Sequence, residues 1–367
     1  MNTPTVAEVR TRRLSVPLHT PFVTALRSTT TVEAVLVEVV DSDGAVGWGE
    51  APQVWQVTGD SLAGSQACLE GPLRDALVGR PADLSESTAL VQRAVVANRS
   101  AKMAADVALH DLAARRSGLT LAQHLAAHVG VTALPPAYVR TDVTLAAGSP
   151  AELASAATAR VDDGFDTLKL KVGTDATTDV ARVLAVRAAV GPGVGLRLDA
   201  NQGWDAFEAV RVIGALEAAG ADVELVEQPV PAHDLIGLAY VTAHVETPVM
   251  ADESLFTLED LVEVIRLDAA DLVNVKLAKC GGLTPALELL RVAHLHGFGT
   301  FVGSMMESHL GVGAAAALVA AVGTTSLPDL DAAWWSVASP YAGGPSYDGD
   351  RLVLSDRPGL GIEGVLS

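Results

Sequence analysis

Three acidic residues recur along the chain, each at the end of a short apolar run. Asp199 ends GLRLD, Glu227 ends VELVE and Asp252 follows PVMA. The intervals of 28 and 25 residues each match one strand–helix unit, so in a barrel the three carboxylates would meet at one rim. They would repel one another unless a cation lay between them. Because only oxygen donors are present, we expect Mg²⁺, with Mn²⁺ as second choice.

Lysines lie on both sides of this acidic series. In LKLK (168–171), Lys169 and Lys171 alternate with leucines, so both point to one face, which in a barrel would be the interior. Lys276 ends VNVK, 24 residues after Asp252. On its own, Lys-x-Lys is typical of an exposed strand edge. Buried ammonium groups need nearby anions, which the acidic series would supply.

Such a set of residues could move a proton on the carbon beside a carboxylate. A divalent cation would stabilise the enediolate that forms when the proton leaves. Burial and neighbouring cations would lower the pKa of a lysine to roughly 7 to 8, where it can act as a base. Lysines on opposite sides of the metal would racemise or epimerise the substrate. A Schiff-base aldolase, which needs a lysine but no metal, and a non-catalytic binding protein are the alternatives from other classes.

The elements that must position these residues change near position 135. Residues 1 to about 125 look like an α+β unit, with a hairpin (34–40 and 45–50) and a helix (101–117) that Gly118 ends. Strands are then expected about every 25 to 30 residues, which predicts a closed barrel. A doubly wound sheet is disfavoured because no Gly-rich phosphate loop follows the first strand. The expected strands are 168–172, 194–199, 223–227, 248–252, 272–277 and 300–304, with helices such as 176–190 and 204–219 between them.

Composition excludes several classes of function. A formal charge of −19 argues against nucleic acid and anionic membranes as partners. Two cysteines, Cys68 and Cys280, suggest neither a disulfide framework nor a Cys-rich zinc site. The first residues resemble no signal peptide, and the apolar run 311–322 is too short to span a bilayer and predicts a buried helix. We therefore expect a cytoplasmic protein.

These motifs together resemble the enolase superfamily, in its muconate-lactonizing-enzyme branch, whose sites combine lysine or histidine bases with Mg²⁺. The resemblance implies an α/β fold, a modified TIM barrel (β/α)₇β with an N-terminal α+β capping domain. It implies a cap over residues 1–128, a barrel over 129–330 and a C-terminal segment, 331–367, that returns to the cap. The matching motifs are LKLKVG (168–173), DANQGW (199–204), EQP (227–229), ADES (251–254), NVKLAKCGG (274–282), GWGEAP (47–52) and PGLGI (358–362).

The resemblance also implies roles for residues. Asp329 and Asp331 lie at the next expected strand end, 53 residues after Lys276; in an extended segment both would face one side, and a solvated turn after Pro328 is the alternative. Asp329-x-Asp331 is similar to a pair in the dipeptide epimerase subgroup that binds the N-terminal amine, and Arg27 to an arginine that pairs with a glutamate side chain. Lys169 would hold the substrate carboxylate and tune Lys171. The remaining implied assignments are Asp199, Glu227 and Asp252 as metal ligands, Lys171 and Lys276 as acid/base groups, Asn201 and Glu253 as supporting groups, and Thr144 and Ser304 as pocket residues.

The activity implied by the resemblance is that of a Mg²⁺-dependent dipeptide epimerase acting at the alpha carbon of the C-terminal residue, foremost of L-Ala-D/L-Glu. It would suit the recycling of cell-wall peptides, and a homo-oligomer is expected. N-acylamino acid racemase, o-succinylbenzoate synthase and cycloisomerase activities remain alternatives. Bulky side chains that could reshape the pocket are Trp55, Met306, Trp334 and Trp335.

Overall fold

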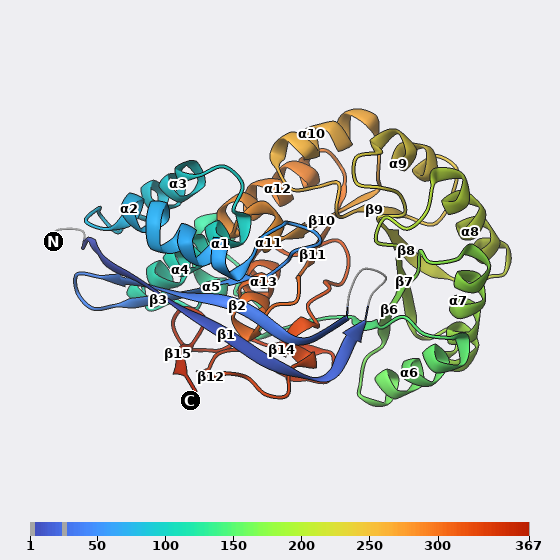
Figure 1. Cartoon of the computed structure of the whole chain (residues 1–367), viewed down its shortest axis with the longest axis horizontal. Helices are drawn as coiled ribbons and strands as arrows, with labels where there is room; N and C mark the ends of the chain where they lie inside the picture. Colours follow the sequence, from blue (N-terminus) through green and yellow to red (C-terminus); the bar gives the residue numbers. More distant parts are fainter. Residues whose placement is uncertain (1–3, 24–27, 367) are drawn as a thin grey trace.

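The computed structural model describes residues 4–23 and 28–366 of the chain. The N-terminal part is an antiparallel sheet of three strands in the order β1 (Val6–Val23), β2 (Ser28–Asp41) and β3 (Val46–Pro52). The pairing of β2 with β3 confirms the predicted hairpin. Figure 1 shows that the long β1–β2 ribbon runs from the cap toward the barrel strands.

Helices pack on this sheet to complete the cap. α4 (Arg99–Arg116) confirms the predicted helix. It lies so close to β3 that a Cβ on Gly47 or Gly49 would clash with its backbone. Gly118 follows α4 with a φ of 66°, as a helix-ending glycine should. The other cap helices are α1 (Leu62–Cys68), the π-helical turn η1 (Leu69–Leu73), α2 (Arg74–Leu77), α3 (Leu84–Ala94) and α5 (Leu121–His128).

The barrel strands form one parallel sheet in sequence order, with the helices outside it (Figure 1). All six predicted strands are present, preceded by the short β5. Asp329 donates its backbone N–H to Val302, and Asp142 donates to Pro328, so the segment around Asp329 joins the two ends of the sheet. The strands are β5 (Val143–Leu145), β6 (Thr167–Lys171), β7 (Gly195–Asp199), β8 (Val223–Glu227), β9 (Val249–Ala251), β10 (Leu272–Lys276) and β11 (Gly299–Gly303).

Six of the described barrel helices, all except α11 and α12, begin at a residue whose side chain caps the helix. Ser149 and Glu152 form a capping box at the start of α6, and Asp205 caps α8. Such caps stabilise the first turn of a helix and so help to define where it begins after the preceding strand. The helices are α6 (Pro150–Asp162), α7 (Ala176–Val190), α8 (Ala206–Ala218), α9 (Leu235–Thr242), α10 (Leu258–Leu267), α11 (Leu277–Cys280), α12 (Leu283–Leu295) and α13 (His309–Val322).

The C-terminal segment returns to the cap. The backbone N–H of Leu121 donates to Gly359 over 2.8 Å, and Arg115 donates to the carbonyl of Ile362 over 2.7 Å. These contacts agree with the expected course of the chain, while the domain boundaries themselves stay a prediction. The segment contains η2 (Ala332–Trp335), β12 (Tyr341–Gly343), β13 (Ser346–Asp348), β14 (Arg351–Val353) and β15 (Ile362–Val365), and β14 pairs with β4 (Tyr138–Arg140).

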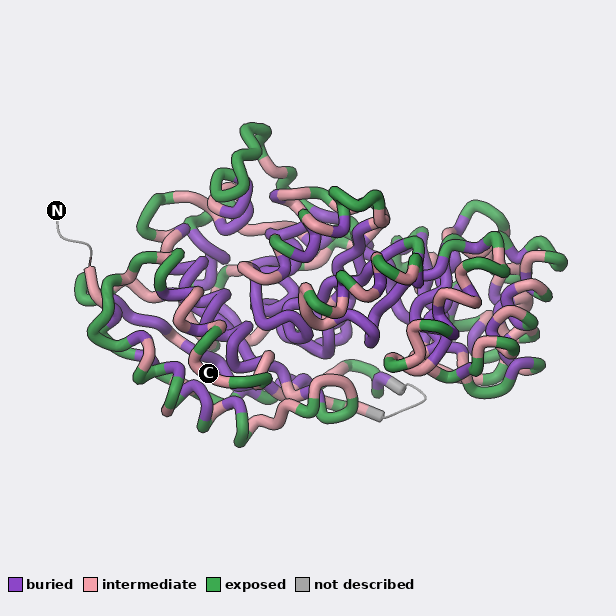
Figure 2. The backbone as a smooth tube through the Cα atoms, turned by 90° about the horizontal axis from the view of Figure 1, so that it is seen from above, coloured by how far each residue is buried: buried purple, intermediate pink, exposed green. Residues whose placement is uncertain are grey.

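Buried residues run continuously from the cap into the barrel (Figure 2). α13 is buried along nearly its whole length, which confirms the buried helix predicted for its apolar run. Among the helices that the structure describes, none is long and apolar enough to cross a membrane.

Candidate active site

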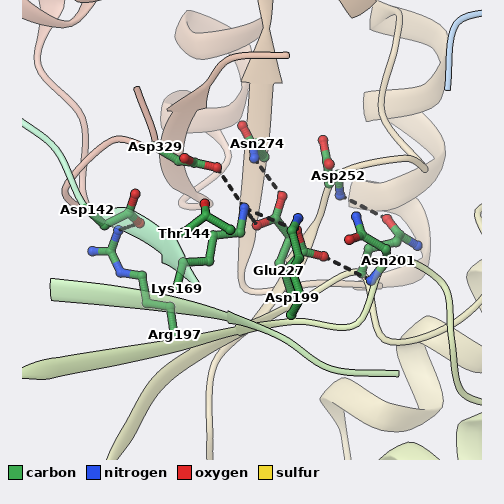
Figure 3. Close-up of polar contacts among 12 residues, drawn as sticks. Asp142, Thr144, Lys169, Arg197, Asp199, Asn201, Glu227, Asp252, Asn274 and Asp329 are labelled. Carbon is green, nitrogen blue, oxygen red and sulfur yellow. Dashed lines mark hydrogen bonds and ion pairs between the residues drawn. The ribbon is translucent and has the colours of Figure 1, made fainter. Parts of the chain in front are cut away.

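The acidic series converges at the C-terminal ends of the strands. Asp199, Glu227 and Asp252 follow one another on β7, β8 and just after β9, and they are 0%, 0% and 2% exposed. Figure 3 shows Asp199 and Glu227 next to each other, with Asp252 to one side of them. The backbone N–H of Asn201 donates to Asp199 over 2.9 Å, and Asn274 donates its amide to Glu227 over 2.8 Å. The loop after β7 and strand β10 thus fix the orientation of Asp199 and Glu227.

Lys169 lies at the centre of this group. Its Nζ is 2.5 Å from Glu227, 2.7 Å from Asp329 and 3.2 Å from Asp199. Figure 3 shows Lys169 between these side chains. The side chain is only 2% exposed. Lys169 therefore points into the barrel among anions, as the alternation of LKLK predicts.

Lys171 and Lys276 approach the group from different strands. Lys171, at the end of β6, places Nζ 2.6 Å from Asp199. Lys276, at the end of β10, places Nζ 2.8 Å from Asp252 and 3.7 Å from Glu227. Both lysines line the same pocket, with the carboxylate series between their strands in the sheet order. This arrangement can present two amines to one bound carbon atom.

The donor set fits a hard divalent cation. The three carboxylates offer oxygen alone, and burial, followed by repulsion from Asp199, raises the pKa of Glu227 to about 6. That repulsion is the strain a cation would relieve. Lys169 contacts Asp199 and Glu227, and Lys276 contacts Glu227 and Asp252. No cluster of three or more acidic, histidine or cysteine side chains in the described ranges is arranged to hold an ion.

Burial and the surrounding carboxylates act in opposite directions on the pKa of Lys169 and of Lys276. We expected burial and neighbouring cations to lower their pKa. Burial does act in that direction on Lys169, but Asp329, Glu227 and Asp199 outweigh it and raise its pKa well above the ordinary value. Asp252 and Glu227 likewise outweigh burial and raise the pKa of Lys276.

The predicted Asp-x-Asp pair forms a wall of the same pocket. Asp329 and Asp331 are 6% and 4% exposed, so a solvated turn is excluded. Asp331 does not continue an extended strand, because its φ and ψ of −85° and −6° begin η2. It accepts hydrogen bonds from the backbone N–H of Thr144 (2.7 Å) and from Nε1 of Trp335 (3.0 Å). Burial and the neighbouring Asp329 raise the pKa of Asp331 to about 6.

The structure places only some of the other predicted pocket residues at the pocket. Thr144 and Ser304 line the pocket, together with Met306. Trp55 is 57% exposed and is not part of the pocket lining. Arg27 lies outside the described residues, and its role stays a prediction.

Phe22, from β1, brings the cap into the site. Its side chain lines the pocket, and its ring packs edge-on against Trp335 at 5.9 Å between centroids. Trp335 in turn holds Asp331. Trp335 therefore orients Asp331, and Trp334 packs against Trp335.

Lys279 is a functional candidate that sequence reasoning missed. It is fully buried, and its Nζ contacts Asp252 at both the backbone carbonyl and Oδ1, the latter at 2.5 Å. It also donates to the carbonyl of Asn274 over 3.0 Å. It lies three residues after Lys276 on the short helix α11, within the motif NVKLAKCGG, which by itself gave this lysine no role. Lys279 thus fixes one oxygen of Asp252 while Lys276 contacts the other.

Replacing Lys279 with Met should destabilise the fold. Removing one partner of a buried ion pair leaves an uncompensated charge, and the expected loss is about 3–5 kcal/mol in the free energy of unfolding. Urea denaturation followed by circular dichroism measures it. The matched control is Arg266→Met, because the Arg266–Glu263 pair is exposed and its loss should leave the midpoint unchanged. Equal midpoints for both variants would contradict the assignment.

Comparison with known proteins gives consistent matches over the whole chain. Residues 6–126 match the N-terminal domain of mandelate racemase / muconate lactonizing enzyme, and residues 152–364 match the enolase C-terminal domain-like family. L-Ala-D/L-Glu epimerases of Bacillus subtilis and Clostridium acetobutylicum are 41% and 39% identical, covering 98% and 96% of this chain and 97% of each relative. A hydrophobic dipeptide epimerase of Enterococcus faecalis is 37% identical and covers 97% of this chain and 99% of the relative.

Solved structures agree with these matches. A substrate-liganded complex of the Bacillus subtilis epimerase superposes with a TM-score of 0.94 at 41% identity, covering 99% of this chain and all of the other. The Enterococcus faecalis dipeptide epimerase, complexed with Mg and L-Leu-L-Tyr, gives 0.91 at 36% identity, covering 98% and 100%.

Proposed function

Because this chain belongs to the mandelate racemase / muconate lactonizing enzyme family of the enolase superfamily and is an isomerase of the epimerase and racemase type, we propose that it is a Mg²⁺-dependent epimerase of dipeptides, foremost of L-Ala-D/L-Glu. The observation that carries the proposal is a single pocket lined by Lys171, Lys276 and the Asp329–Asp331 wall. The family assignment does not support the Schiff-base aldolase alternative.

The pocket residues divide the reaction between them. Mg²⁺, held by Asp199, Glu227 and Asp252, would supply positive charge to the substrate carboxylate as negative charge builds on it. Lys169 adds a fixed ammonium group beside the same carboxylate. In one direction Lys171 takes the alpha proton and Lys276 returns one to the opposite face, and in the other direction the roles reverse. Carboxylates engaged by the cation would pull less strongly on the lysine protons, which favours a neutral base.

Asp331 is proposed to recognise the substrate amine together with Asp329. Asp331→Asn should raise the KM for L-Ala-L-Glu roughly 10- to 100-fold with a smaller effect on kcat, because a charged hydrogen bond contributes about 1.5–3 kcal/mol. Steady-state kinetics measures the change. An N-acetylated Ala-Glu should be a poor substrate of the wild type and insensitive to the substitution. An unchanged KM for the free dipeptide would remove Asp331 from amine recognition.

Arg27 is proposed to select glutamate at the C-terminal position. Arg27→Gln should lower kcat/KM for L-Ala-L-Glu about 10- to 100-fold by removing a charge-assisted hydrogen bond, while L-Ala-L-Leu is affected little. L-Ala-L-Leu is a useful comparison because the pocket contains the apolar Met306 and one relative is a hydrophobic dipeptide epimerase. A loss of the same size on both dipeptides would argue against a role in selecting glutamate.

A substrate panel tests the proposed function as a whole. Dipeptides with acidic, small and hydrophobic C-terminal residues are incubated with enzyme and Mg²⁺ beside N-succinyl amino acids, and isomers are separated by chiral chromatography. We expect Ala-Glu to be among the best substrates and N-succinyl amino acids to be among the worst. Preference for N-succinyl amino acids would instead support the racemase alternative.

A further inference from the structure

Two glutamates that the proposed reaction does not use lie buried where the cap meets the barrel. Glu50, near the end of β3, and Glu307, between β11 and α13, are 0% and 1% exposed. A Cβ placed on Gly311 would lie 2.6 Å from Oε1 of Glu50 and 2.5 Å from Oε2 of Glu307. The two carboxyl groups therefore face the same point near the N-terminus of α13.

Glu50 has the surroundings of an anion. The backbone N–H of Ser308 donates to its Oε1 over 2.8 Å, the Ser308 hydroxyl contacts its Oε2, and the Tyr341 hydroxyl lies 3.3 Å from Oε2. Ser308 is also the N-cap of α13, whose first N–H groups favour a negative charge. Burial raises the pKa of Glu50, and these donors oppose that shift. A carboxylate of the cap is thus bound by donors of the barrel.

Glu307 has the surroundings of a neutral acid. Its Oε1 accepts a hydrogen bond from the backbone N–H of Met305 over 2.9 Å, whereas its buried Oε2 has no hydrogen-bond partner among the described residues. A second carboxylate beside Glu50 would be costly without a donor, and a proton on Oε2 makes that oxygen a donor itself. Burial, and then Glu50, raise the pKa of Glu307 to about 8, in agreement with this chemistry.

We infer that Glu307 is a positioning residue that stays protonated, donates to Glu50 across the cap–barrel seam and fixes the pocket wall at Met305 and Met306. Both methionines line the pocket, and the Met305 N–H is held by Glu307. Lys276 also acts electrostatically on Glu307, so an ionised Glu307 would compete with Asp252 for this lysine. The statement about the pocket rests on the proposed function, and the protonation of Glu307 does not.

The test uses Glu307→Gln, which keeps the shape but cannot ionise. An acid with a higher pKa in the folded than in the unfolded chain lowers stability as pH rises between the two values. The Tm of the wild type relative to Glu307→Gln should therefore fall from about pH 4.5 to about pH 8 and then level off. The other titratable groups around Glu307 are present in both proteins: Glu50, Lys276, Tyr341 and His309. The difference in Tm between the two proteins therefore reports the titration of Glu307.

Infrared spectroscopy in ²H₂O gives a second readout that does not depend on activity. At pH 6 the wild type should have a band of a protonated carboxylic acid that Glu307→Gln lacks. Glu307→Gln should keep kcat/KM within about threefold, whereas Glu50→Gln, which loses the anion, should raise KM about tenfold or more.

Three outcomes would overturn the inference: parallel Tm profiles, an unchanged infrared band, or a Glu307→Gln chain that does not fold. Absence of epimerase activity in the wild type would count against the proposed function alone, because the Tm and infrared measurements still decide the state of Glu307.

Discussion

Replacing Lys276 with Ala should abolish epimerisation of both isomers of Ala-Glu while leaving exchange of the alpha proton on one of them. Each isomer presents its alpha proton to one lysine only, so without Lys276 the substrate facing Lys171 can still lose its proton and regain one on the same face. The expected loss of epimerisation is about 10²- to 10⁴-fold, the usual contribution of a positioned acid or base. Chiral chromatography measures epimerisation, and NMR in ²H₂O measures exchange.

Lys171→Ala is the matched partner of that variant. It should retain exchange only on the isomer that Lys276→Ala cannot exchange. Both variants remove a lysine that is ion-paired to a carboxylate, so a general effect on the site would be the same in both. If both variants lost exchange on the same isomer, the two lysines would not act on opposite faces of the alpha carbon.

Removal of the divalent cation should also abolish turnover. Chelation with EDTA is expected to stop epimerisation and added Mg²⁺ to restore it, because the developing charge then has no counter-ion. Glu227→Gln should weaken the apparent Mg²⁺ affinity at least about 100-fold. Loss of a residue that only supports a metal ligand usually weakens affinity about 10- to 100-fold, and loss of a ligand should cost at least as much. Titration calorimetry with Mg²⁺ measures the affinity.

Glu224→Gln is the control for this substitution. Glu224 lies on the same strand, but its side chain is 44% exposed and pairs with Arg197, away from the acidic series. Its Mg²⁺ affinity should equal that of the wild type. Full activity of the wild type in EDTA, or equal Mg²⁺ affinities of the two variants, would be incompatible with Glu227 as a ligand.

Strand-end residues were predictable from the sequence because the parallel barrel has a strict period. Asp199, Glu227, Lys171 and Lys276 lie at positions that the strand repeat determines. In the structure the two lysines line the pocket and contact the two buried carboxylates. The resemblance to the superfamily added the Asp-x-Asp wall, which spacing alone left open as a solvated turn.

Residues in turns and short helices were not predictable in this way. Lys279 acts through the geometry of α11, and Glu307 faces Glu50, 257 residues away, only because α13 packs on β3. Asp331 was expected in an extended segment, yet it begins η2 because its carboxylate accepts from Thr144 and Trp335. Such contacts depend on tertiary packing, which no local pattern records.

The origin of the alpha hydrogen in the first product molecules tests the central claim most directly. L-Ala-L-Glu is incubated with enzyme and Mg²⁺ in ²H₂O and quenched early, and both isomers are analysed by mass spectrometry. If Lys171 and Lys276 act from opposite faces, the newly formed L-Ala-D-Glu contains deuterium at the alpha carbon from its first appearance. An epimerised product that keeps the original hydrogen, or the absence of any exchange, would contradict the two-lysine account.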